Sequence, residues 1–131
     1  MTIEVYYDNE NDCVIGRLIG VADRQTFIDY ANEVMSVVSQ YDCGRFLNDL
    51  RRTEPAMSTK ELSSFPDELE KIMSSKKIYK TKWYRAVVVS EDPKYFGHAL
   101  YYEVASRNRG HFESTFTDIN EAMSWLKSVS L

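Results

Sequence analysis

The sequence predicts a single α/β domain over residues 1–131, with a mixed, mostly parallel five-stranded sheet and about four helices. Segments with the two-residue period of strands alternate with segments that have the 3.6-residue period of amphipathic helices, in the order β-β-α-β-α-β-α-β-α. The continuous apolar run Ala86–Val89 is typical of a strand that is covered on both faces. Such alternation implies right-handed crossovers between parallel strands, and no repeat or low-complexity linker divides the chain.

The N-terminal third is expected to form a hairpin, a helix and a third strand. Thr2–Tyr7 alternates apolar and polar residues, and Cys13–Ile19 resumes the pattern after a polar turn, so the first strand is added antiparallel. Asp23 is the expected N-cap of a helix over Arg24–Gln40, and Arg45–Leu50 is the next strand. The apolar residues of this helix lie on one stripe: Phe27, Ala31, Val34, Met35 and Val38.

The middle of the chain is expected to contain a helix in two segments and a buried strand. Ser58 and Glu61 have the spacing of a capping box. We expect the helix that they begin to be interrupted at Pro66, because proline removes a helical hydrogen bond, and to resume over Asp67–Ser74. Tyr84–Ser90 follows as a strand.

The C-terminal third is expected to form a helix, a strand and a helix. Asp92–Pro93 pairs a capping residue with proline at the first helical position, and Gly110 is the expected C-cap of that helix. His111–Phe116 is the last strand, and Asp118 begins the last helix. The helix after Asp92 is expected to bury Phe96, Ala99, Leu100 and Val104.

Composition excludes the extreme classes of protein. The chain carries 16 Lys and Arg against 20 Asp and Glu, a net charge of −4, and 44% of its residues are hydrophobic, which is ordinary for a globular domain. No apolar run is long enough to cross a bilayer, and no charged-then-apolar leader opens the sequence. Because Cys13 and Cys43 do not form a disulfide framework, we expect a reducing, cytoplasmic environment.

No recognised catalytic, nucleotide-binding or metal-binding motif is present. The five glycines form no phosphate-binding loop, and His98 and His111 lack the spacing of metal ligands. Cys43 follows a helix, where the dipole raises a thiol pKa, and no nucleophile elbow exists. We therefore expect no cofactor and no metal. An enzyme would need titratable groups that converge in a cleft, for example Asp49 with His98.

Charged residues gather where the third predicted strand ends. Open α/β sheets place ligand sites at the carboxyl edge of their parallel strands. Asp49, Arg51 and Arg52 lie at this edge and could hold a charged ligand or a partner, together with Arg24 and Ser90. The alternative is that Asp49 caps the loop and pairs with Arg51 or Arg52, since structural ion pairs are common.

Three hydroxyl residues near the following helix are candidate phosphoacceptors. Thr53, Ser58 and Thr59 are expected to be exposed near a helix N-terminus, where an added phosphate is electrostatically tolerated. Ser58 is also explained as an N-cap alone, and the capping-box spacing favours that interpretation.

The segment Lys71–Ser90 is basic within an acidic domain. It carries six cations and no acid, so the other 111 residues carry a net charge of −10. Cations interleaved with aromatic rings are typical of nucleic-acid binding, but the pI of 5.2 and the absence of a binding motif give no support for it. The segment is either a solvated loop or a surface that orients an encounter with a charged partner.

Aromatic residues cluster on the helix that follows Asp92. Tyr95, Tyr101 and Tyr102 share it with Phe96 and His98. An exposed aromatic face would suit a partner surface, such as a homodimer, or the wall of an apolar pocket. Ordinary core packing with hydroxyls that reach solvent explains these residues equally well.

The chain resembles the SpoIIAA-like family, relatives of the STAS domain of anti-sigma-factor antagonists. The resemblance covers nearly the whole chain. Its residues are Gly16–Gly20 before the Asp23 helix, Arg45–Arg51 with its Asp-Leu-Arg ending, and Arg85–Val89 followed after a helix by Phe116–Leu126.

This resemblance implies a bacterial, non-enzymatic α/β domain that regulates through protein contacts. Antagonists of the family carry a phosphorylatable Ser or Thr near the strand-end Asp, where this chain has Leu50–Arg52, so we expect the usual phospho-switch to be absent. A protein-interaction module predicts a flat surface near Asp49. The family is also similar to lipid-binding domains of the CRAL-TRIO type, and such a carrier predicts an apolar cavity beneath the Phe65 helix and the Tyr95–Phe96 helix.

Overall fold

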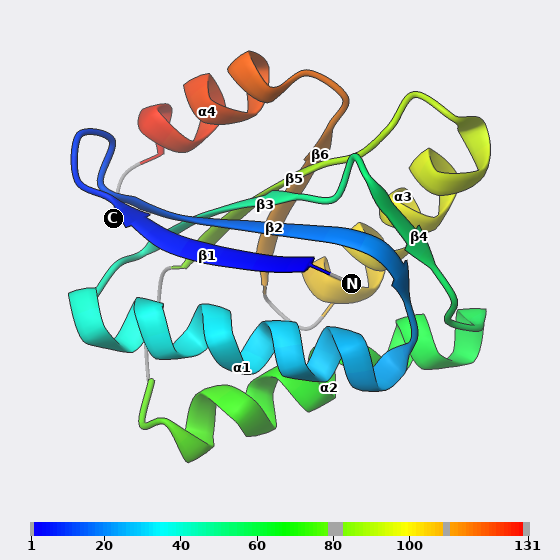
Figure 1. The fold of residues 1–131 in the computed structure, drawn as a ribbon, viewed down its shortest axis with the longest axis horizontal. Coiled ribbons are helices and arrows are strands. Elements are labelled where there is room, and N and C mark those ends of the chain that lie inside the picture. Colours follow the sequence, from blue (N-terminus) through cyan, green and yellow to red (C-terminus); the bar gives the residue numbers. More distant parts are fainter. Residues whose placement is uncertain (1, 79–82, 109–110, 130–131) are drawn as a thin grey trace.

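The computed structural model describes residues 2–78, 83–108 and 111–129, which form one sheet with helices on both faces (Figure 1). The strands in these residues are β1 (Thr2–Asp8), β2 (Cys13–Ala22), β3 (Arg45–Asp49), β4 (Thr53–Pro55), β5 (Tyr84–Val88) and β6 (Phe112–Phe116). The helices in the same residues are α1 (Arg24–Tyr41), α2 (Thr59–Ser75), α3 (Pro93–Arg107) and α4 (Ile119–Ser128).

The sheet has the order β1-β2-β3-β5-β6, with β1 antiparallel to β2 and the other neighbours parallel. This confirms the predicted fold class and element order. The short strand β4 was not expected: it pairs with the end of β2, from Gly20 opposite Thr53 to Ala22 opposite Pro55. It forms because β2 extends beyond the last residue of β3 and leaves unpaired backbone groups there.

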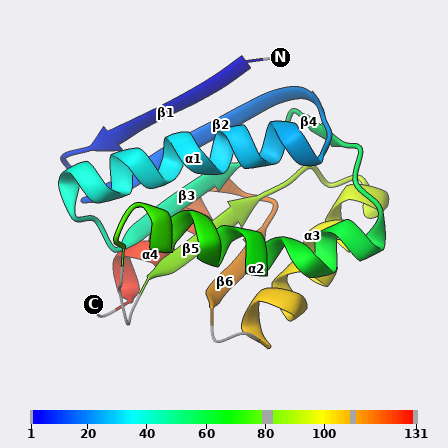
Figure 2. The ribbon, with the colours of Figure 1, turned by 90° about the horizontal axis from the view of Figure 1, so that it is seen from below.

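The helices divide unequally between the two faces of the sheet. α1, α2 and α3 cover one face and α4 covers the other, as Figures 1 and 2 show from two directions. Two hydrophobic clusters result. The larger lies between the sheet and the three helices and includes Val34, Phe46 and Leu69. The smaller lies beneath α4 and includes Leu47 and Leu126.

The sequence prediction for α1 is confirmed at its start and on its buried face. The Asp23 side chain accepts a hydrogen bond from the backbone N–H of Thr26 (2.9 Å), which satisfies one of the free donors at the helix start. Ala31, Val34 and Val38 are buried, so the apolar stripe faces the sheet as expected.

Pro66 does not interrupt α2, contrary to the prediction. The helix continues through it from Thr59 to Ser75, and the Pro66 side chain is fully buried. Proline inside a helix costs about 3 kcal/mol. Burial of Leu62, Phe65 and Leu69 on the same helix offsets this cost.

The buried face predicted for α3 is only partly correct: Phe96 and Ala99 are partly buried, as expected, but the other two predicted residues are not. Leu100 and Val104 are exposed, at 39% and 58% of their maximum, whereas Ala105 and Ser106 are buried. Apolar residues lie on every side of this helix, so periodicity could not choose between faces. The predicted C-cap, Gly110, lies outside the described residues.

Candidate functional site

Asp49 is buried and held by two arginines. Its carboxylate accepts bonds from Arg51 Nε (2.9 Å) and Nη2 (2.8 Å) and from Arg17 Nε (3.1 Å), and its exposed fraction is 3%. Burial alone would raise the pKa of Asp49, but these hydrogen bonds outweigh it and lower the pKa. The structure therefore shows the predicted pairing of Asp49 with Arg51. Arg17, its direct partner across β2 and β3, is one that the sequence analysis missed.

The other residues predicted for this surface each contact a different part of the protein and form no hydrogen bond or ion pair with Asp49. Arg24 joins α1 to α2 through Glu68 (2.9 Å). Arg52 is exposed in the turn after β3, and its carbonyl accepts a bond from the N–H of Gly20 (3.0 Å). Ser90 lies just after β5 and accepts a bond from a backbone N–H two residues later. A shared binding surface at this edge stays a prediction.

The three candidate phosphoacceptors differ in accessibility. Thr53 is buried, contrary to the expectation of an exposed hydroxyl, because β4 adds to the sheet and its Oγ1 donates to the carbonyl of Leu18. Ser58 and Thr59 are exposed. The capping box is confirmed: Ser58 Oγ accepts from the N–H of Glu61 (3.2 Å), and Glu61 Oε1 accepts from the N–H of Ser58 (3.1 Å).

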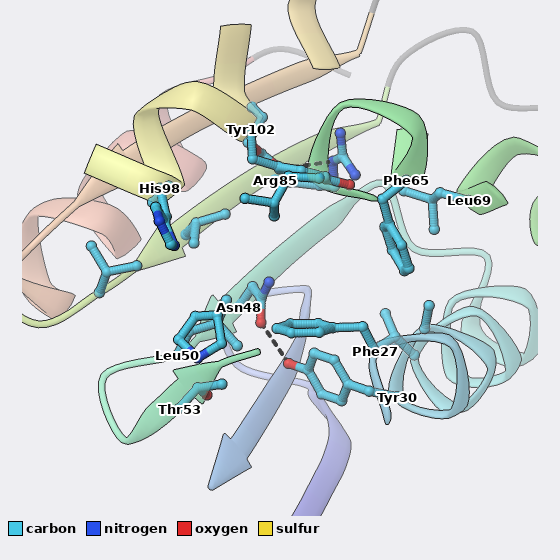
Figure 3. A pocket seen from close by; sticks show the side chains of 18 of the residues that line it. Phe27, Tyr30, Asn48, Leu50, Thr53, Phe65, Leu69, Arg85, His98 and Tyr102 are labelled. Atoms are coloured by element: carbon cyan, nitrogen blue, oxygen red, sulfur yellow. Dashed lines mark hydrogen bonds and ion pairs between the residues drawn. The ribbon is translucent and has the colours of Figure 1, made fainter. Parts of the chain in front are cut away.

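A cavity of about 110 Å³ lies between the sheet and the three helices on its larger covered face. Figure 3 shows side chains from α1, α2 and α3 pointing toward the same space over β3 and β5. Its walls include Phe65 of α2 and Tyr95 of α3, where the carrier hypothesis places an apolar cavity. The apolar lining includes Phe27, Ala31, Val34, Met35, Phe46, Leu50, Met57, Leu62, Leu69, Val87 and Ala99.

The aromatic residues of α3 have two different roles. Tyr95 and Tyr102 line the cavity, together with His98, whereas Tyr101 is exposed at 45%. The pocket-wall interpretation therefore holds for two of the three tyrosines on this helix. Burial raises the pKa of Tyr102, so its hydroxyl stays protonated at neutral pH.

An ion pair is buried in the cavity lining. Arg85 and Glu113 are direct partners across β5 and β6, and Arg85 Nε lies 3.6 Å from Glu113 Oε1. Their side chains are 4% and 2% exposed. Burial raises the pKa of Glu113 to about 7, although the nearby Arg85 charge opposes the shift. Arg85 also places its charge 5.1 Å from the centre of the Trp83 ring.

Several polar atoms of the cavity lining lack a hydrogen-bond partner among the described residues. They are Trp83 Nε1, Arg85 Nε, His98 Nδ1 and Glu113 Oε2. Buried polar groups in native proteins are almost always paired, so four such atoms around one cavity mark it as unusual. By contrast, the Tyr30 hydroxyl in the same wall donates to Asn48 Oδ1 (2.6 Å).

His111 links Arg85 to the surface. Arg85 Nη2 donates to His111 Nδ1 (3.1 Å), and His111 Nε2 lies 3.0 Å from Glu70 Oε1. Because an arginine always donates, Nδ1 acts as the acceptor, and His111 carries its proton on Nε2 and donates it to Glu70. Arg85 therefore contacts His111 through Nη2 and faces Glu113 through Nε.

The sheet separates the pair of residues suggested for an enzyme. Phe46 and Asn48 line the cavity, so the alternation of β3 turns Asp49 toward the opposite face. His98 lies on the cavity side. Asp49 and His98 therefore do not converge in one cleft.

Arg85 and Glu113 were not predicted as site residues. Arg85 was counted in the basic segment Lys71–Ser90, yet it is buried in β5, and Lys80 and Lys82 lie outside the described residues. One feature could have marked each residue, although not their pairing: each is the one charged residue of its strand.

The described part of the chain has neither a cluster of metal ligands nor a helix that could span a membrane. No three His, Cys, Asp or Glu side chains there are placed to hold a metal ion. Every helix there is too short or too polar to cross a bilayer.

Comparisons with known proteins agree with this architecture. No family model and no curated protein matches the chain. The anti-sigma factor antagonist SpoIIAA in its unphosphorylated form is similar over 98% of this chain and 100% of its own, with a TM-score of 0.54 and 10% identity. An uncharacterized protein from the DUF3478 family with a SpoIIAA-like fold, from Shewanella loihica PV-4, is similar over 95% and 92%, with a TM-score of 0.52 and 15% identity. The chain therefore has the SpoIIAA-like fold that its sequence predicts.

Proposed function

We propose that this domain binds a small, largely apolar molecule in the cavity beneath α1, α2 and α3, and acts as its carrier or sensor rather than as an enzyme. The observation that carries the proposal is a cavity of about 110 Å³ whose lining contains buried polar atoms without partners. Protein interiors are close-packed, and an apolar pocket with a few polar groups is the usual form of a ligand site.

The size of the cavity limits the part of a ligand that it can enclose. An engineered protein cavity of about 150 Å³ holds one benzene molecule. The cavity here is somewhat smaller, at about 110 Å³, so it suits a single ring or a few carbons of a longer chain. A longer ligand would have to extend out of the cavity or move its walls.

Purification from the host followed by native mass spectrometry tests this proposal. We expect a small apolar molecule to remain bound and to appear after solvent extraction. Ala99→Phe should abolish this adduct, because Ala99 lines the cavity and the larger ring fills it. Leu100→Phe is the matched control, since Leu100 is exposed on the same helix. An adduct that persists in Ala99→Phe, or no adduct in the wild type, would contradict the proposal.

Regulation through protein contacts is the second candidate function. One observation favours it: the apolar residues Leu100 and Val104 are exposed on α3. The fold is also similar to that of a protein described as an anti-sigma factor antagonist. A stoichiometric protein partner in the same mass spectra would support this function. We expect Ser58→Asp and Thr59→Asp to leave the affinity for such a partner unchanged, and a changed affinity would show a phospho-switch.

A further inference from the structure

The Arg85–Glu113 pair of the cavity lining is incompletely satisfied. One Arg85 nitrogen contacts His111, and another faces Glu113 Oε1 at 3.6 Å, which is too long for a hydrogen bond. Arg85 Nε and Glu113 Oε2 have no hydrogen-bond partner among the described residues, and both side chains are more than nine-tenths buried. The cavity therefore offers one free donor and one free acceptor from the same ion pair.

The charge of this pair restricts what can bind beside it. Above the raised pKa of Glu113, Arg85 and Glu113 are both ionised and their charges cancel, so a charged ligand group would enter the cavity without a counter-ion. Burial of an unpaired charge is costly. A ligand carboxylate would compete with Glu113 for Arg85, and a ligand ammonium would compete with Arg85 for Glu113. A neutral group avoids both penalties.

A hydroxyl is the smallest neutral group that can satisfy both free atoms, because it has one donor and two acceptor lone pairs. A carbonyl accepts only, and a hydrocarbon leaves both atoms unpaired. Resting on the proposed function, we infer that the ligand is a neutral alcohol, whose hydroxyl accepts a hydrogen bond from Arg85 Nε and donates one to Glu113 Oε2. Its hydrocarbon part lies among the apolar side chains, such as Phe27 and Leu69.

A set of matched one-ring compounds tests the inference by calorimetry on the full chain at about pH 8.5, where Glu113 is ionised. Toluene, benzyl alcohol, benzoate and benzylamine share a carbon skeleton and differ only in the polar group. We expect benzyl alcohol to bind the wild type about tenfold more tightly than toluene, as two hydrogen bonds to buried groups imply. Benzoate and benzylamine should bind at least tenfold more weakly than benzyl alcohol.

The variant Glu113→Gln should shift the preference of the cavity from the neutral alcohol toward the anionic benzoate. It keeps the size of the side chain but leaves Arg85 as an uncompensated charge beside the cavity. We expect the affinity for benzoate to rise at least tenfold and the affinity for toluene to stay unchanged. Glu33→Gln, on the exposed face of α1, is the matched control and should change none of the affinities. The measurements on the wild type remain decisive if Glu113→Gln does not fold.

The outcomes separate this inference from the proposed function. If the wild type binds toluene as tightly as benzyl alcohol, or prefers benzoate or benzylamine, the cavity binds ligands but the assignment of an alcohol is wrong. If benzoate gains no affinity in a folded Glu113→Gln, the role of the ion pair is wrong. If none of the four compounds binds, both proposals are contradicted.

Discussion

Arg85 and Glu113 occupy directly opposed positions of the parallel strands β5 and β6, with Arg85 Nε 3.6 Å from Glu113 Oε1 in the lining of the cavity. Parallel pairing places both side chains on the same face of the sheet, toward α3. Buried pairs of this kind contribute little net stability, because desolvation of two charges cancels most of their attraction. Under the proposed function, this pair therefore serves the binding site more than the stability of the fold.

The pH dependence of stability should report the burial of Glu113. Its pKa is raised to about 7 in the folded protein, so the stabilisation from proton binding is complete below its ordinary value of 4.5 and is lost as the pH rises toward 7. The shift corresponds to about 3 kcal/mol at most. Glu113→Gln should remove this component from the free energy of unfolding, measured by urea denaturation between about pH 5 and pH 8. Parallel pH profiles of wild type and variant would show that Glu113 does not titrate in this range.

Asp49→Asn should destabilise the fold by about 1–3 kcal/mol, because it removes the negative charge that pairs with two arginines and replaces one of the two acceptor oxygens with a donor. The arginines retain access to water, which keeps the cost below that of a fully buried pair. Since the pKa of Asp49 is lowered, its contribution is present above its ordinary pKa and disappears as the pH falls through the lowered value. Urea denaturation measures the difference. The exposed Asp29→Asn is the control, and equal effects would refute the structural role of Asp49.

Two glycine substitutions should have opposite effects. A Cβ at Gly16 would overlap the Tyr30 hydroxyl and lie 2.9 Å from Phe46 Cε1, so Gly16→Ala should cost about 1–3 kcal/mol. A Cβ at Gly97 in α3 would meet no atom within 4 Å outside the backbone of its own helix, so Gly97→Ala should stabilise by about 0.5–1 kcal/mol through helix propensity. Thermal unfolding distinguishes the two, and a neutral Gly16→Ala would contradict the close packing of α1 on β2.

Ser58→Ala should destabilise α2 by about 1 kcal/mol through loss of the capping bond to the Glu61 N–H. Thr59→Ala, at the next exposed position, should change the free energy of unfolding by less than about 0.5 kcal/mol. Chemical denaturation of both variants checks this difference. Equal losses would mean that Ser58 does not act as the cap.

Local sequence patterns correctly predicted the starts of helices that have a strong capping residue. Asp23 and the capping box at Ser58 located the starts of α1 and α2, because these signals act within one helical turn. β4 was missed because it has only three residues, one of them Pro55, which is too few to show the two-residue period of a strand. It forms only because β2 is long enough to pair with it. The buried face of α3 was predicted only in part because apolar residues surround that helix, and its tertiary contacts determine that Leu100 is exposed.

The candidate site was predictable in its apolar part only. Phe65 and Tyr95 belong to helices whose location over the sheet follows from the fold, and both line the cavity. The polar part depends on strand pairing: Glu113 lies opposite Arg85 only because β6 joins β5 in one register. Local sequence patterns give neither the order of the strands nor their register, so they could not predict that Arg85 and Glu113 form a pair.

An NMR titration of the wild type with benzyl alcohol tests the central claim most directly, because methyl groups lie on both sides of the sheet. Ala31, Met57 and Ala99 line the cavity, whereas Ala122 and Met123 belong to α4 and pack on the opposite face of the sheet. If the cavity binds the alcohol, shift changes and intermolecular NOEs will appear at Ala31, Met57 and Ala99 and will be absent at the methyl groups of the two α4 residues. Shift changes centred on Ala122 and Met123, or no saturable change at any methyl group, would contradict binding in the cavity.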